Sequence, residues 1–224
     1  MFANHRPRWP LYALLGLLAL LLLGLLQPIG IDELLHWGIA LAGHSATLPT
    51  LLLLMAALMS FGLPGSLCFW LIAPFYSPLI SVPVLVMGSV AGAAGAYALG
   101  HRVGSAVRPN RLARQVLTLL ARRSDFLTQC ALRILPAFPH AFINLAAGVL
   151  HLPLTSFLLA AVLGLSIKWL VYAYAVHGMV SARLAEQSLD LSTLLPLFGL
   201  AGLLLTGSLV RRHWLRADDH APLR

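Results

Sequence analysis

The chain has 224 residues, of which 59% are hydrophobic and only 10% are charged. A soluble domain usually carries about 25% charged residues, so this chain has too little polar surface to coat a water-exposed globule. Its formal charge is +8. Because the arginines sit at the ends of apolar runs and not on one polar face, they indicate membrane flanks and argue against a nucleic-acid partner.

Four apolar runs are long enough to cross the hydrocarbon core of a bilayer. They lie at 11–27, 82–100, 154–177 and 193–210. The first run follows two arginines and is not followed by a small-residue cleavage site. We therefore predict an uncleaved transmembrane helix and not a signal peptide.

Arginine placement predicts the orientation of these spans. The arginines cluster at 6–8, 102–123 and 211–216, and such clusters favour the cytoplasmic side. Both termini are then cytoplasmic. The segments 28–47 and 181–192, which contain acidic residues, are predicted to be external loops.

Two further apolar stretches, 48–78 and 126–153, are broken by proline and glycine. The orientation requires each stretch to begin and end on the same side, which is typical of a re-entrant hairpin. Pro64 and Pro78 have the same spacing as Pro139 and Pro153. We therefore predict an all-α polytopic membrane protein, a helical bundle in which two oppositely oriented re-entrant hairpins form an inverted repeat.

The predicted organisation has three parts. An N-terminal transmembrane helix with an external loop covers 1–47, the hairpin core covers 48–180, and the last transmembrane helix with a basic tail covers 181–224. Within the core, 109–123 has apolar residues at helical spacing with arginines on the other side. It is predicted to lie on the cytoplasmic surface with its arginines among headgroups.

Two charged residues fall inside the second half of the core, and charges within a membrane are functional candidates. Arg133 is predicted ~13 Å deep, and no acidic residue in the apolar segments can pair with it. The possible partners of Arg133 are then hairpin carbonyls, water or a lipid phosphate. Its role is therefore either to cap the hairpin carbonyls or to bind phosphate, or both. Lys168, near Trp169 and Tyr172, is predicted to snorkel to the outer interface.

Other polar and small residues suggest structural roles. Asn144 can satisfy broken backbone or touch a headgroup, and Gly88, Gly92 and Gly95 are spaced for close helix packing. His140 and His151 have no acid or cysteine nearby to complete a metal site. No catalytic motif is present, so we expect no cofactor, no metal and no enzymatic activity.

One series of residues resembles a known family. Its members lie in the second broken stretch: Arg133, Pro136, Pro139, Asn144 and Gly148. They resemble the DedA / SNARE-associated Golgi protein superfamily (the VTT domain), and the resemblance covers 48–178. The earlier Pro64-Gly65 pair and the 88–104 segment with Tyr97 fit the first half. Because the first broken stretch lacks an acid, the chain is more similar to the Golgi-vesicle-protein-like branch.

The resemblance implies a bundle with two opposed hairpins and an activity that moves phospholipid or polyprenyl-phosphate between leaflets. We therefore expect a scramblase or flippase-type transporter of the plasma (inner) membrane. Its expected partners are lipids with an anionic headgroup or phosphate, and a homo-oligomer stays open. The alternative is a non-transporting membrane factor that supports envelope integrity through protein partners. The candidate site comprises Arg133, Pro136, Pro139, Asn144, Gly148, Pro64 and Gly65, followed by Lys168 and Tyr97.

Overall fold

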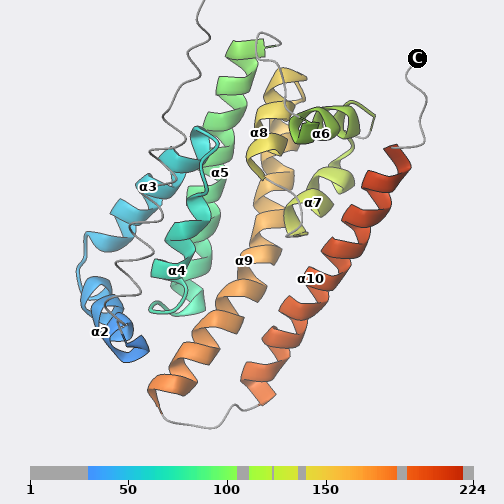
Figure 1. The fold of residues 1–224 in the computed structure, drawn as a ribbon. Helices are drawn as coiled ribbons and strands as arrows, with labels where there is room; N and C mark the ends of the chain where they lie inside the picture. Colours follow the sequence, from blue (N-terminus) through green and yellow to red (C-terminus); the bar gives the residue numbers. More distant parts are fainter. Residues whose placement is uncertain (1–29, 105–110, 123, 136–139, 186–190, 219–224) are drawn as a thin grey trace, which may run out of the picture. The chain divides into compact units, whose positions relative to one another are not determined.

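The computed structural model describes residues 30–104, 111–122, 124–135, 140–185 and 191–218, and all regular elements in these ranges are helical (Figure 1). The chain divides after Leu41 into two compact units, and the helices from α3 onward belong to the second. The helices are α2 (Ile31–Ala42), α3 (Thr47–Ser60), η1 (Gly65–Cys68), α4 (Phe69–Ile72), α5 (Pro78–Val103), α6 (Arg111–Arg122), α7 (Phe126–Ile134), α8 (His140–Val149), α9 (Leu154–Leu184) and α10 (Leu191–Asp218). The all-α class is thus confirmed.

Two of these helices, α5 and α9, are long and apolar enough to cross a membrane. With 26 and 31 residues they measure about 39 and 46 Å at 1.5 Å per residue, which exceeds a hydrocarbon core of about 30 Å. They contain the predicted spans 82–100 and 154–177. The predicted span 193–210 lies in α10, where Leu194–Val210 is a shorter apolar stretch. The predicted span 11–27 lies outside the described residues.

The acidic segment predicted as an external loop contains a helix. In α2, Asp32 and Glu33 occupy the first turn, where carboxylates interact favourably with the positive end of the helix dipole. The segment 28–47, predicted to be an external loop, thus contains a helix over residues 31–42. The last turns of α9 likewise continue past 177, to Leu184.

Both broken stretches form a helix, an interruption and a second helix. In the first, α3 is followed by Gly62 at a φ of +76° and then by η1 and α4. Glycine adopts this left-handed conformation without steric cost. In the second, α7 is followed by α8. Gly65 begins η1 and His140 begins α8, an offset of 75 residues (140 minus 65) that matches the offset between Pro64 and Pro139.

Helix α3 packs along α5 through glycines. A Cβ atom on Gly88 would lie 3.2 Å from Sδ of Met55, and one on Gly92 would lie 2.5 Å from Cβ of Met59. Gly95 faces Ser60 in the same way. Residue numbers rise together on both helices, so α3 and α5 run in the same direction. The predicted packing role of these three glycines is confirmed.

Helices α7 and α9 are related in the same manner. The thiol of Cys130 lies 3.8 Å from the Ala160 carbonyl oxygen, and a Cβ atom on Gly164 would lie 2.8 Å from Cβ of Arg133. The later residue of α7 contacts the later residue of α9 in these two pairs, so α7 runs parallel to α9. Each long helix therefore has a shorter, parallel partner that precedes it in the chain.

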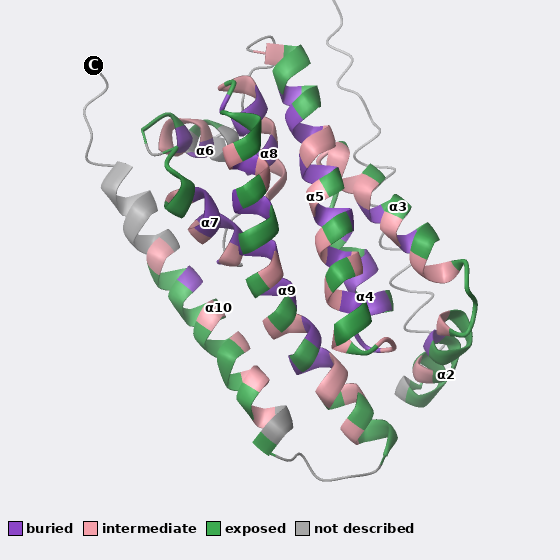
Figure 2. Cartoon of the chain, turned by 180° about the vertical axis from the view of Figure 1, so that it is seen from behind, coloured by how far each residue is buried: buried purple, intermediate pink, exposed green. Residues whose placement is uncertain are grey.

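The two long helices, α5 and α9, contact each other and run in opposite directions. The indole Nε1 of Trp169 donates to Oγ of Ser89 at 2.9 Å, and the Tyr97 and Phe157 rings lie 5.2 Å apart. As numbers rise on α5 they fall on α9, so these helices are antiparallel. All four of these residues are buried, and the buried positions of both helices are purple in Figure 2.

The helix predicted within 109–123 is confirmed over 111–122 as α6, and it packs against α8. Val116 and Leu120 are buried in the same cluster as Ile143 of α8, while Arg114 and Arg122 are exposed. The apolar face of α6 is therefore covered by protein, and its described arginines face outward.

Candidate functional site

Arg133 is the penultimate residue of α7, and its side chain is only 1% exposed. Its Nη1 donates to the Gln129 carbonyl oxygen at 3.1 Å, and its guanidinium lies 4.5 Å from the centre of the Phe157 ring. The buried Nη2 has no hydrogen-bond partner among the described residues. Leaving a buried charged donor unsatisfied costs more than about 1–3 kcal/mol, so this atom marks a place for an acceptor.

Among the residues that the structure describes, no carboxylate pairs with this cation. Asp125 is the only acidic residue in the sequence between Glu33 and Glu186. Its side chain accepts hydrogen bonds from the backbone N–H and the hydroxyl of Thr128, at 2.9 and 2.7 Å, and so caps α7. Arg133 lies eight residues further on, about 12 Å along the helix.

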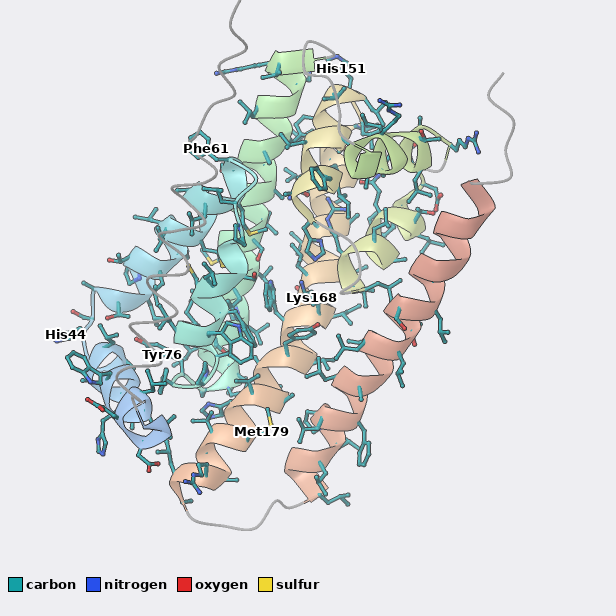
Figure 3. All side chains as sticks on the ribbon, viewed as in Figure 1. His44, Phe61, Tyr76, His151, Lys168 and Met179 are labelled. Atoms are coloured by element: carbon teal, nitrogen blue, oxygen red, sulfur yellow. The ribbon has the colours of Figure 1, made fainter. Side chains whose placement is uncertain are left out.

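Lys168 is the second buried cation, 8% exposed. Its Nζ lies 3.0 Å from Nε2 of His140 and 4.7 Å from the centre of the Trp169 ring, with Tyr172 at 5.7 Å. Figure 3 shows it near the middle of α9. The prediction that Lys168 snorkels was wrong, because the residue is about 21 Å from the start and about 24 Å from the end of α9 and finds an acceptor and two aromatic faces in place.

Three basic residues from three helices therefore form one group. Arg133 of α7 packs against Gly164 of α9, which lies one helical turn before Lys168 on the same face, and Lys168 in turn contacts His140, the first residue of α8. We call these three residues the basic cluster. It lies where the second broken stretch is interrupted, and no acidic residue of the surrounding sequence balances it.

The remaining predicted residues of α8 hold this helix against α5. Asn144 and Gly148 are buried. A Cβ atom on Gly148 would collide with the Tyr97 carbonyl oxygen and would lie 2.8 Å from the His101 amide nitrogen. The Tyr97 hydroxyl donates to the Leu152 carbonyl oxygen at 2.6 Å. Gly148 and Tyr97 thus have structural contacts that position α8.

The predicted residues of the first broken stretch lie with α3. Pro64 is exposed, and Gly65 is buried where a Cβ atom would collide with Met59. The end of α3 also reaches α8, because a Cβ atom on Gly62 would lie 3.8 Å from Cβ of Ala141. Two predicted residues, Pro136 and Pro139, lie outside the described residues.

The sequence analysis missed the role of His140, which it considered only as a metal ligand. His140 and Lys168 are 28 residues apart, and no spacing signal connects them. It also missed Gln129, which is buried beside Arg133 with its Oε1 unpartnered among the described residues. The sequence signal for the contact between Lys168 and His140 was Lys168 itself, a charged residue in the middle of a predicted span with no acidic residue near it in the sequence. Within the described ranges, no group of three or more potential metal ligands occurs.

Removing the Tyr97 hydroxyl tests the α5–α8 arrangement. We expect Tyr97→Phe to lower the free energy of unfolding by about 1–2 kcal/mol, because the buried Leu152 carbonyl loses its donor. Thermal unfolding in detergent measures this loss. The matched control is Tyr174→Phe, since Tyr174 is exposed on α9. Equal stability of both variants would contradict the assigned role.

The two long apolar helices α5 and α9, within an all-helical fold, are those of an integral membrane protein. The VTT domain family model matches residues 48–178, which is more than half of the chain, so the chain belongs to the VTT-domain (DedA/SNARE-associated) family. It is 29% identical over 181 residues to the transmembrane protein 41 homolog of Caenorhabditis elegans, covering 78% of this chain and 73% of the relative. It is 26% identical over 162 residues to an uncharacterized membrane protein of Arabidopsis thaliana, covering 69% and 56%. No solved structure gives a significant match.

Proposed function

We propose that this protein moves lipids between the two leaflets of a membrane, as a scramblase or flippase-type transporter. The observation that carries the proposal is the buried Arg133, whose Nη2 has no partner among the described residues at the interruption between α7 and α8. A guanidinium binds phosphate through two parallel hydrogen bonds, and every phospholipid headgroup contains that group. Arg133 would contact the headgroup as it passes.

The arrangement of the helices supports a path between leaflets. We infer that the two broken stretches are re-entrant hairpins related as an inverted repeat. The support is that α3 is parallel to α5, α7 is parallel to α9, and the two long helices are antiparallel. Proteins built from such repeats bind substrate where their broken helices meet. A further support is that Gly62, in the first interruption, lies beside Ala141 near the start of α8, where a Cβ atom on Gly62 would be 3.8 Å from Cβ of Ala141.

The proposed setting is the plasma (inner) membrane with both termini and the 102–123 segment on the cytoplasmic side. The three arginine clusters support this orientation. The described arginines of α6 face outward, where anionic headgroups would meet them.

Leaflet exchange by the purified full-length protein tests the function. The protein is reconstituted in vesicles with fluorescent phospholipids, and a membrane-impermeant quencher reports the fraction that reaches the outer leaflet. We expect quenching to pass the one-half level set by the outer leaflet, whereas protein-free vesicles stay there. Identical traces from both vesicle preparations would favour the non-transporting membrane factor.

A further inference from the structure

We propose that Lys168, held in place by His140, makes the basic cluster select lipids whose headgroup carries a net negative charge over zwitterionic lipids. The proposal rests on the proposed function and names the substrate class of the same site. The shared chemistry is an anionic phosphate group, and Lys168 is the specificity-determining residue.

The contact between Lys168 and His140 leaves the positive charge of Lys168 unbalanced. An ammonium group only donates hydrogen bonds, so Nε2 of His140, at 3.0 Å, is the acceptor and the imidazole is neutral. This bond uses one of the three N–H donors of Lys168. His140 therefore orients the ammonium group without neutralising it, which makes His140 a positioning residue.

The local charge disfavours a second cation in the ligand. Arg133 and Lys168 contribute two positive charges, and no acidic residue occurs between Asp125 and Glu186. A zwitterionic headgroup would bring its own ammonium close to both. Aromatic faces could hold such an ammonium. However, the faces of Trp169 and Tyr172 already lie against Lys168.

A headgroup with net negative charge has no such conflict. Its phosphate can accept from Nη2 of Arg133, and its excess charge compensates Lys168 in a region of low dielectric, where charge interactions are strong. Arg133 thus recognises the phosphate group that all phospholipids share. Lys168 distinguishes phospholipids by the net charge of their headgroups.

The test compares phosphatidylglycerol with phosphatidylcholine, each carrying the same acyl-chain fluorophore, in vesicles of equal parts of the two lipids. We expect the wild-type protein to exchange phosphatidylglycerol faster by at least about threefold, which corresponds to a difference of about 0.6 kcal/mol or more. Lys168→Met should bring the ratio of the two rates close to one. Lys168→Arg should retain most of the preference, because it keeps the charge. His140→Ala should lower the ratio by an intermediate amount.

The matched control is Arg183→Met, which removes an equal charge from the exposed last turn of α9, the helix that carries Lys168. It should leave the ratio as in the wild type, and an equal fall in both variants would overturn the proposal. If Lys168→Met does not fold, Lys168→Gln gives the same comparison, since Gln can still donate to His140.

Two further outcomes separate the hypotheses. Equal wild-type rates for both lipids would overturn the selectivity but leave lipid exchange standing, whereas no exchange of either lipid would overturn the proposed function itself. Labelled inorganic phosphate identifies the source of the anion. We expect no uptake of it into the vesicles, and uptake that disappears in Lys168→Met would assign the site to free phosphate and overturn the lipid proposal.

Discussion

Arg133→Lys should reduce lipid exchange by at least about tenfold, and Arg133→Ala should reduce it further. Lysine keeps the charge but has no planar pair of donors for phosphate. A hydrogen bond to a charged group contributes about 1.5–3 kcal/mol, and 1.4 kcal/mol is tenfold in rate. The rates are measured in reconstituted vesicles, on protein shown to be folded by size-exclusion chromatography and thermal unfolding.

Arg183→Met serves as the control here too, because it removes a charge from the exposed last turn of α9. Its exchange rate should equal that of the wild type. A folded Arg133→Ala protein with wild-type exchange would leave Arg133 only the role seen in its bond to Gln129, that of capping a carbonyl near the end of α7.

Gly148→Ala should lower the free energy of unfolding by about 3 kcal/mol. The added Cβ atom would meet the backbone of Tyr97 and His101, and a backbone cannot move aside as a side chain can. Helices α5 and α8 would have to separate. We expect the midpoint of thermal unfolding in detergent to fall by roughly 5–10 °C.

Gly202→Ala is the matched control for this substitution. Gly202 lies on α10, and a Cβ atom there would meet nothing within 4 Å. This change should be neutral or slightly stabilising, since alanine is the better helix former. Equal stability of Gly148→Ala and the wild type would mean that the two backbones are not held in contact.

Much of the fold could be predicted because a bilayer imposes simple rules on sequence. Length and hydropathy located α5 and α9, and small-residue spacing identified the packing of α3 on α5. The proline spacing located the interruptions in both broken stretches. Each of these signals is local, or repeats along the chain at a fixed distance.

The basic cluster could be predicted only in part, because it depends on contacts between distant segments. Sequence placed Arg133 deep in the membrane without an acid to pair with it. It could not pair Lys168 with His140, since that contact requires α8 to return beside the middle of α9. Snorkelling was the default for a lysine whose partner is unknown. The helix α2 was not predicted, because its acidic residues were used to place the segment on the external side and were not interpreted as the start of a helix.

The composition of α5 has a consequence for which mutations the protein can accumulate. The buried positions of this helix are mostly Gly, Ala and Ser, whereas Leu79, Ile80 and Met87 are exposed. Lipid tails are as apolar as leucine, so burial within a membrane sorts side chains by volume more than by polarity. Evolutionary drift on the outer face of α5 can exchange one bulky apolar residue for another freely. On its inner face, even a conservative apolar enlargement would be removed by selection.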